Sequence, residues 1–328
     1  MNILVVGGAG YVGSHACHFL DRAGHQVWIL DNLSRGHRDA ALSGRLLVGD
    51  VADRNQTRQI LRDKQIEAVM HFAAFALVGE SVADPSLYYH NNVVATLHLL
   101  DAMRDVGVNR FVFSSTTATY GEPKQIPIPE TTPQNPINPY GFTKLVIERA
   151  LADYAHAYGL GYAALRYFNA AGASPEGDIG EDHDPESHLI PIVLQVALGQ
   201  RDHITVFGED YDTPDGTCIR DYIHVDDLAA AHLRALQLLE DGRGLCLNLG
   251  TGVGNSVQDV IAACRQVTGH PIPVIAGARR PGDPSRLVAD SRLAQQVLGW
   301  RPKYTEIGEI VKTAWKWHNT HPHGYRRG

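Results

Sequence analysis

The sequence predicts an α/β fold in which a doubly wound parallel sheet carries a smaller, interleaved C-terminal domain. Three observations predict it. Short apolar runs alternate with amphipathic segments through the first half, a glycine-rich turn follows the first run, and loops rich in Gly, Pro and acidic residues begin near residue 170. Such alternation of strand and helix is typical of a parallel sheet covered by helices on both faces.

Strands and helices are expected to alternate from the N-terminus. A short apolar run bounded by Gly or Asp indicates a strand buried on both faces, whereas apolar residues three or four apart indicate a helix. The expected strands are 2–8, 25–31, 45–51, 68–74 and 110–115, and the expected helices are 10–24, 53–65, 91–107 and 139–159.

The second half of the chain differs from the first in composition and in its pattern of apolar residues. Residues 169–187 predict a loop region, and 221–242 predict a strand end and a helix that return to the larger domain. We therefore assign residues 1–168, with 219–250 returning, to the larger domain, and residues 169–328 mainly to the smaller one. Within the latter, helices are expected at 256–269 and 306–321 and a strand at 271–277.

Composition limits the class of protein. The chain has 328 residues, 44% of them hydrophobic, and a formal net charge of -7, which argues against nucleic acid or an anionic membrane as the main partner. Four cysteines without a Cys-x-x-Cys pair fit reduced thiols in a cytosol better than disulfides. The apolar run at the N-terminus is interrupted by glycines and is too short for a signal peptide or a membrane span. We therefore expect a soluble, cytoplasmic protein.

Seventeen histidines raise the question of a metal site. The segment EDHDPESH, residues 181–188, has the residue types of a metal site but is dense in charge and contains Pro185. We interpret it as a solvated or substrate-side loop, and we predict no metal.

The glycine-rich turn predicts a dinucleotide site. Gly8, Gly10 and Gly13 satisfy G-x-G-x-x-G, and Gly7, Gly10 and Gly13 satisfy the G-x-x-G-x-x-G variant. Glycines permit a tight turn close to a pyrophosphate, and the following helix supplies free N–H groups. Since the motif lies between an expected strand and helix, it indicates a Rossmann domain.

Asp31, at the end of the second expected strand, indicates the choice of cofactor. Its carboxylate can accept hydrogen bonds from an adenosine ribose and would repel a 2′-phosphate, so NAD is favoured over NADP. Arg35 nearby keeps NADP open as an alternative. Asp50 and Val51, at the end of the third strand, are placed to contact the adenine.

The segment NPYGFTK places Tyr140 and Lys144 four residues apart at a helix start. Residues at this spacing share a helix face, although most such pairs are simply surface neighbours. Here the hydroxyl-rich run SSTTATYG ends the preceding strand, at the sheet edge where ligands bind in such folds. An ammonium and an oxidised nicotinamide ring would lower the tyrosine pKa, which predicts an acid–base site.

Six segments together resemble the UDP-glucose 4-epimerase family of extended short-chain dehydrogenase/reductases. They are GGAGYVGSH, FSSTTATYG, NPYGFTK, RYFNAAGA, RDYIHVDDLA and NLGTGVGNSV, and the resemblance runs from Met1 to Tyr325. It implies that Tyr140 is the acid/base, that Lys144 lowers its pKa and binds the nicotinamide ribose, and that Thr116 bonds the sugar 4-hydroxyl.

The resemblance also implies two sets of binding residues. The NAD set is Gly7, Gly10, Tyr11, Val12, Gly13, Asp31, Asn32, Asp50, Val51, Phe72, Ala73, Ala74, Asn91, Ser114, Tyr140, Lys144 and Tyr167. The UDP-sugar set is Thr116, Tyr140, Asn169, His188, Leu189, Thr205, Phe207, Arg220, Arg280, Asp283 and Leu287.

Two positions depart from the family pattern. Ala76 stands where some members carry a lysine that reaches the cofactor, so NAD is expected to be held less tightly. His188 stands where some members have an asparagine touching the diphosphate. Neither departure touches the acid–base group.

The resemblance implies interconversion of UDP-galactose and UDP-glucose through a 4-keto sugar, by a homodimer formed through 91–103 and 144–158. A dehydratase would need an Asp-Glu pair where this chain has Thr117 and Ala118. A 4-epimerase of UDP-glucuronate, UDP-xylose or a UDP-N-acetylhexosamine stays open. An NAD-sensing module without turnover would be expected to have lost the tyrosine or the lysine.

Overall fold

A seven-stranded parallel sheet forms the larger part of the molecule, with strand order β10-β6-β5-β4-β1-β2-β3. The computed structural model describes residues 1–280 and 283–325. The strands of this sheet are β1 (Asn2–Val6), β2 (Gln26–Asp31), β3 (Arg45–Val48), β4 (Ala68–His71), β5 (Arg110–Thr116), β6 (Gly161–Tyr167) and β10 (Gly244–Leu249).

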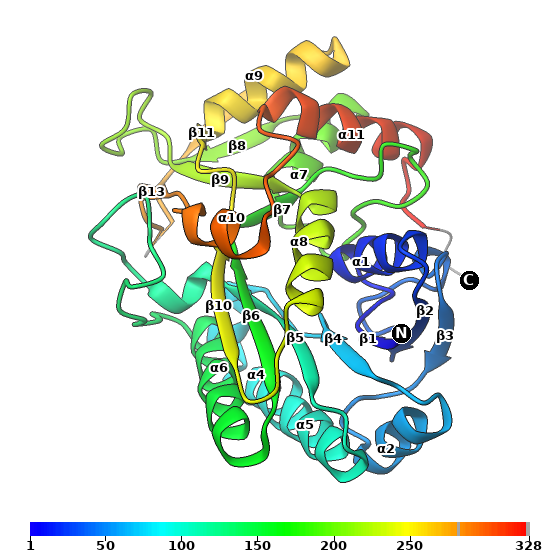
Figure 1. Ribbon diagram of the computed structural model, residues 1–328. Coiled ribbons are helices and arrows are strands. Elements are labelled where there is room, and N and C mark those ends of the chain that lie inside the picture. The colour runs from blue at the N-terminus through cyan, green and yellow to red at the C-terminus, as the bar shows by residue number, and fades with distance from the viewer. Residues whose placement is uncertain (281–282, 326–328) are drawn as a thin grey trace.

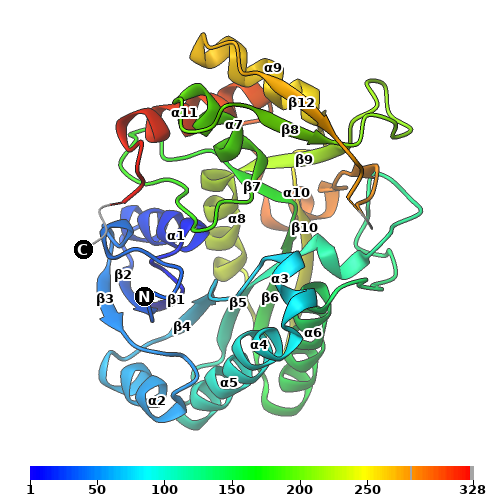
Figure 2. The ribbon, with the colours of Figure 1, turned by 180° about the vertical axis from the view of Figure 1, so that it is seen from behind.

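Helices cover both faces of this sheet, because its strands are apolar on both sides. In β1, Ile3 and Val5 pack into one core cluster, whereas Leu4 and Val6 pack into another on the opposite face. Figures 1 and 2 show α1 and α8 on one face and α2, α5 and α6 on the other. The bounds are α1 (Tyr11–Arg22), α2 (Arg54–Asp63), α5 (Ala95–Val106), α6 (Pro139–Tyr158) and α8 (Val225–Gln237).

Short helical segments connect these layers. They are the 3₁₀ helices η1 (Arg38–Ala40) and η3 (Thr117–Tyr120), the helices α3 (Val78–Ala83) and α4 (Pro85–Tyr88), and the π-helical η2 (Tyr89–Val94).

The smaller part lies above the carboxyl ends of the large sheet's strands (Figure 1). β9 is central in it and pairs with β11, β13 and β7, while β12 and β8 form a separate pair. Its strands are β7 (Asn169–Ala171), β8 (Ile204–Phe207), β9 (Ile219–His224), β11 (Gly254–Ser256), β12 (Val274–Gly277) and β13 (Arg286–Leu287). Its helices α7 (Leu189–Ala197), α9 (Val257–Thr268) and α11 (Ile307–Thr320) enclose a core of their own.

The chain passes between the two parts more than once. Residues 219–224 form β9 of the small part, whereas α8 and β10 join the large one. The helix α10 (Arg292–Leu298) also packs on the large part, where Ala294 and Leu298 enter the cluster that contains α8.

The predicted α/β fold with a parallel sheet is confirmed, and several boundaries differ. The expected strand 2–8 ends at Val6, because Gly7 turns the chain with a φ of 80°. The expected helix 91–107 is π-helical up to Val94 before it becomes α5. The expected strand 271–277 begins only at Val274, and the expected loop 169–187 starts with β7.

Candidate active site

The glycine turn between β1 and α1 is closely packed. A Cβ on Gly13 would lie 2.1 Å from the carbonyl oxygen of Gly7, and one on Gly7 would lie 2.4 Å from the nitrogen of Ala73. Gly10 is the N-cap of α1 and donates its N–H to Gly7 at 3.3 Å. The absence of side chains leaves the first N–H groups of α1 accessible, so this turn fits a dinucleotide pyrophosphate.

The Asp31 carboxylate lies beside this turn, at the end of β2. It accepts hydrogen bonds from the backbone N–H groups of Ala9 at 3.0 Å and Leu33 at 2.8 Å. Burial raises the pKa of Asp31, and these two hydrogen bonds oppose the rise. Arg35, the residue that kept NADP open, donates instead to Glu80 at 2.8 Å.

The predicted cofactor residue Asn32 and the predicted adenine contacts Asp50 and Val51 are also near the end of β2. Asn32 donates to Asp50 at 3.0 Å, which joins the ends of β2 and β3. Val51 follows Asp50 and packs against the core cluster on the α2 face.

The end of β4 contacts the glycine turn directly. Phe72 and Ala73 both donate their N–H groups to the carbonyl of Val6, at 2.8 and 3.1 Å. Ala74 follows in the same segment. The predicted residues Tyr11 and Val12 begin α1 on the other side of the turn, and Tyr11 donates its hydroxyl proton to the Gly172 carbonyl at 2.6 Å.

Tyr140 is held in the first turn of α6. The Asn138 side chain caps this helix by accepting the N–H of Gly141 at 2.9 Å, and Pro139 occupies the first helical position. The Tyr140 phenol lies beside the side chain of Thr116, the last residue of β5. The strand end and the helix start therefore bring the proposed acid–base pair together.

Lys144 lies one turn further along α6 and is buried. Its ammonium donates to the Ser114 carbonyl at 2.8 Å, and the Ser114 hydroxyl is 2.5 Å from that of Tyr167. Burial lowers the pKa of Lys144 to about 7, whereas the charge of Glu148 raises it.

The predicted fall in the Tyr140 pKa is not a property of the chain by itself. Burial raises the pKa of this phenol, and the nearby Thr116 side chain offsets only part of the rise. Desolvation disfavours a phenolate, and the Lys144 ammonium is directed at a backbone carbonyl. Bound oxidised NAD would supply the further positive charge that favours the phenolate.

The predicted UDP-binding residues gather in the small part. Arg220 on β9 forms an ion pair with Asp283, and the Arg280 guanidinium lies 4.2 Å from the centre of the Phe207 ring. Thr205 and Phe207 are on β8, Asn169 begins β7, Leu189 begins α7, and Leu287 lies on β13 opposite Arg220.

The imidazole of His188 is paired with two glutamates instead of facing these residues alone. Its Nδ1 is 2.7 Å from Glu181 and 3.3 Å from Glu186. Any contact of His188 with a diphosphate would therefore use its Nε2.

Comparison with known proteins agrees with this geometry. Residues 3–250 match the model of the NAD dependent epimerase/dehydratase family. The UDP-glucose 4-epimerase of Halalkalibacterium halodurans is 57% identical, over 99% of this chain and 98% of that protein. This chain belongs to the UDP-glucose 4-epimerase family.

Solved structures of the family share the fold throughout. A UDP-glucose 4-epimerase from Brucella ovis in complex with NAD is 50% identical, with a TM-score of 0.93 over 96% of this chain and 97% of that one. The UDP-glucose 4-epimerase from Bifidobacterium longum, in complex with NAD+ and UDP, is 38% identical, with a TM-score of 0.94 over 99% of this chain and 100% of that one. The chain is thus an enzyme, an NAD-dependent epimerase.

Sequence reasoning missed Asn92 of this epimerase. The predicted residue Asn91 donates to the Asn92 side chain at 2.9 Å. Asn92 is fully buried, accepts the Phe75 N–H at 2.9 Å and donates to Thr143 at 3.2 Å, so it ties the chain after β4 to α6. The Asn-Asn pair was visible in the sequence, but only the structure shows which member is buried.

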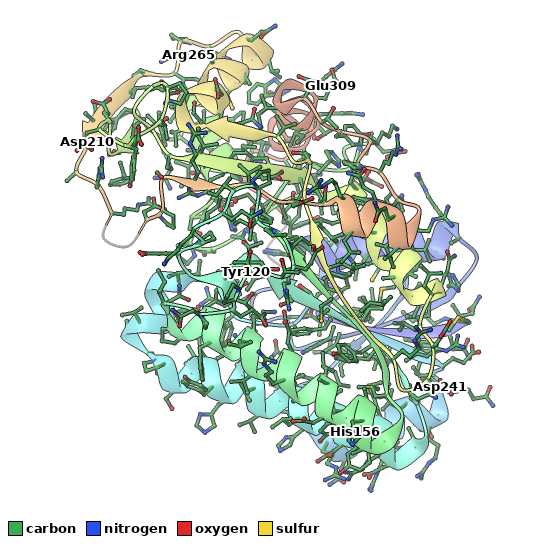
Figure 3. The ribbon with its side chains drawn as sticks, turned by 60° about the vertical axis from the view of Figure 1, so that its left-hand side comes forward. Tyr120, His156, Asp210, Asp241, Arg265 and Glu309 are labelled. Atoms are coloured by element: carbon green, nitrogen blue, oxygen red, sulfur yellow. The ribbon has the colours of Figure 1, made fainter. Side chains whose placement is uncertain are left out.

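A buried polar network behind α6 was also missed. Tyr120 donates its hydroxyl proton to Asn248 at 2.7 Å and accepts from Arg166 at 2.8 Å. Figure 3 shows Tyr120 near the middle of the epimerase, whereas His156 lies at its lower edge.

No helix among residues 1–280 and 283–325 is long and apolar enough to cross a membrane.

Proposed function

We propose that this chain interconverts UDP-galactose and UDP-glucose by NAD-dependent epimerisation at C4. The observation that carries the proposal is the position of Tyr140 beside Thr116, with buried Lys144 one helical turn away. In open parallel sheets ligands bind at the carboxyl ends of the strands, and Thr116 ends β5 there, as β1 leads into the glycine turn.

Tyr140 is proposed to remove the proton of the sugar 4-hydroxyl, with Thr116 bonding the same oxygen. NAD, when bound, supplies the hydride acceptor and donor, so that C4 is oxidised and then reduced. Tyr140 returns its proton after the 4-keto sugar has turned its other face, which inverts C4. Lys144 orients the ribose and favours the phenolate.

A sugar that turns in the site cannot supply the main binding energy. We assign that role to the UDP portion, held by Arg220, Asp283 and the Arg280–Phe207 pair. Contacts remote from C4 anchor the substrate through both halves of the reaction. In this assignment residues 1–168 and the returning segment 225–250 bind NAD, whereas β9 and the rest of residues 169–328 bind most of the UDP-sugar.

The assembly is proposed to be a cytoplasmic homodimer through 91–103 and 144–158. Support comes from apolar side chains on these segments, since Val94 is 39% and Tyr158 is 56% exposed.

The rival reactions lack comparable support. Elimination would require an acidic side chain at position 117 or 118, and these positions hold Thr117 and Ala118. A sensing module would not need Tyr140, Lys144 and Thr116 together. Other UDP-sugars would use the same acid–base group, so they remain a question of substrate range.

The proposal is tested by denaturing the purified protein, identifying the released nucleotide, and assaying native protein with UDP-galactose without added NAD. We expect NAD or NADH to be released and UDP-glucose to form. Bound NAD without turnover would favour the sensing module, and turnover of UDP-glucuronate or UDP-xylose alone would replace the substrate.

A further inference from the structure

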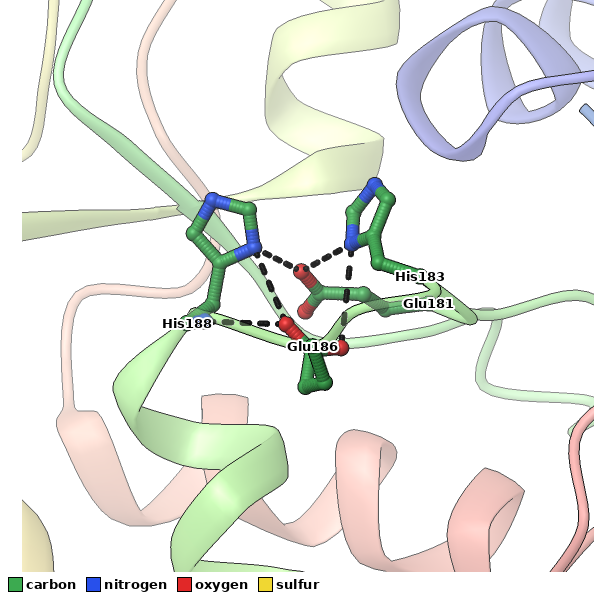
Figure 4. Close-up of side chains that lie close together, drawn as sticks. All are labelled: Glu181, His183, Glu186 and His188. Atoms are coloured by element: carbon green, nitrogen blue, oxygen red, sulfur yellow. Dashed lines mark hydrogen bonds and ion pairs between the residues drawn. The ribbon is translucent and has the colours of Figure 1, made fainter. Parts of the chain in front are cut away.

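The loop between β7 and α7 gathers two histidines and two glutamates. Glu181, His183, Glu186 and His188 each offer one nitrogen or oxygen, and these four atoms lie within 4.8 Å of one another. Figure 4 shows the two imidazole rings directed at the Glu181 carboxylate from opposite sides, with Glu186 beneath them. Four potential ligands therefore face one point.

The separations match a coordination shell. Nδ1 of His183 lies 3.2 Å from Glu181 and 3.7 Å from Glu186, and Nδ1 of His188 lies 2.7 and 3.3 Å from the same two carboxylates. Ligand atoms about 2.0–2.2 Å from a tetrahedral Zn²⁺ would be roughly 3.3–3.6 Å apart. These four distances bracket that range, while the whole set of ligand atoms extends to 4.8 Å, so side-chain shifts would be needed to complete the shell.

Burial supplies a second, independent observation. Glu181 is only 4% exposed. Its Oε1 and the Nδ1 of His183 are both buried, and neither makes a hydrogen bond among the residues that the structure describes. Their close contacts are ion pairs: the two atoms lie 3.2 Å apart, and Oε1 of Glu181 is also 2.7 Å from Nδ1 of His188. Buried polar atoms are normally satisfied, and a cation between them would satisfy both.

We propose that these four residues bind one divalent first-row transition metal ion, for which Zn²⁺ is the best match. Mixed imidazole and carboxylate ligands suit such ions, whereas Mg²⁺ and Ca²⁺ prefer oxygen alone. Both histidines bind as neutral rings through Nδ1 and both glutamates as carboxylates. The ligand charges cancel that of the ion, and any protons on the rings pass to solvent.

The position of the loop indicates a structural role. The His183 ring contacts Tyr11 of α1, with centroids 6.1 Å apart, and Arg35 donates to the Asp184 carbonyl at 3.0 Å. His188 immediately precedes α7 in the small part. The ion would therefore fix the start of α7 to a loop that lies against the glycine turn. Four protein ligands are typical of structural sites.

The competing interpretation is a pair of imidazolium–glutamate ion pairs without metal. Elemental analysis separates the two. Protein without a histidine tag is equilibrated with Zn²⁺, dialysed against metal-free buffer, and measured for zinc. We expect about one Zn²⁺ per chain in the wild type and in the control Glu240→Gln/His156→Gln, whose residues are exposed. The matched variant Glu181→Gln/His188→Gln should fall to about one fifth or less.

Two measurements on the wild type keep the test independent of whether that variant folds. Co²⁺ in place of Zn²⁺ should give the visible absorption of a tetrahedral site. Zn²⁺ added at about 100 times its Kd to chelator-treated protein should raise Tm by roughly 4 °C. Less than about one tenth of a zinc per chain, with no change in Tm and no cobalt spectrum, would overturn the proposal and leave the ion pairs. None of these readouts depends on epimerase activity, so their failure would not affect the proposed function.

Discussion

Glu148 and Arg166 form a buried ion pair behind the Tyr140 helix, with Nη2 of Arg166 2.6 Å from Glu148. Ser115 donates to the same carboxylate at 2.5 Å, and Gln134 does so at 2.8 Å. Since Glu148 lies one turn after Lys144 on α6, this pair joins the helix that carries the acid–base group to β5 and β6.

Glu148→Gln is expected to destabilise the protein by about 3–5 kcal/mol, because it leaves the Arg166 guanidinium buried without a counter-charge. Urea unfolding measures the change. The control is Glu240→Gln, which removes the partner of exposed Arg243 and should cost under about 1 kcal/mol. If the two substitutions lowered the free energy of unfolding equally, the buried pair would contribute no more to stability than the exposed one.

Tyr140→Phe should keep the fold and bound NAD and lower kcat by about 10²–10⁴, the usual contribution of general acid–base catalysis. Steady-state kinetics with UDP-galactose measure this. Tyr304→Phe removes the phenol of a half-buried residue outside the proposed site and the proposed dimer segments, and it should leave kcat unchanged. A kcat near that of the wild type in Tyr140→Phe would refute the assignment of the base.

The lowered pKa of Lys144 predicts that the stability of the NAD-free protein depends on pH. Its pKa is about 7 in the fold and 10.5 ordinarily, so between these values the unfolded chain binds more protons. The free energy of unfolding should therefore rise with pH, by at most about 1.4 kcal/mol per unit from this one group.

Urea unfolding at pH 7 to 9 checks this prediction. Lys144→Met should remove the rise that belongs to this group, whereas Lys124→Met, at an exposed position, should retain it. Parallel profiles for the wild type and Lys144→Met would contradict the shift.

Asp31 should determine which dinucleotide the protein retains. Mass spectrometry of the released nucleotide should show NAD or NADH, and Asp31→Ala should weaken retention so that added NAD restores activity. Asp31→Asn keeps a side-chain acceptor for the Ala9 N–H but removes the negative charge. This variant therefore separates the hydrogen bond that holds the glycine turn from the repulsion of a 2′-phosphate. NADP as the main species in the wild type would overturn the role of Asp31.

The family resemblance implies that Leu287 lies at the wall near the 2-position of the sugar, so we expect it to limit the group at that position. It is half-buried on β13 beside Arg220, and forcing an acetamido group against it is expected to cost about 1–3 kcal/mol. We expect poor turnover of UDP-N-acetylglucosamine by the wild type, and a roughly 10- to 200-fold gain in kcat/KM for that sugar in Leu287→Gly. UDP-glucose kinetics in the same variant serve as the control. Equal use of both sugars by the wild type would exclude Leu287 as the limit.

The sequence predicted features that depend on local pattern. Buried strands such as β1 follow from apolar runs, and the start of α6 follows from Pro139, because these preferences act over a few residues. Burial of Asn92 depends on how distant segments pack, and convergence of Glu181 with His188 depends on the path of the loop between them. The segment 181–188 was interpreted as a solvated or substrate-side loop, since its charges gave no sign that Glu181 would be enclosed.

The seventh strand of the large sheet has a consequence for synthesis of the chain. β6 is complete at Tyr167, but its neighbour β10 ends only at Leu249, after much of the small part has been made. At about 5–20 residues per second, the β6 edge would remain unpaired on the ribosome for roughly 4–16 s. Unpaired edges are templates for association with other chains, so aggregation of nascent protein should be greatest in this interval. Chains truncated between residues 170 and 240 are therefore expected to be insoluble, whereas chains that extend past β10 bury this edge.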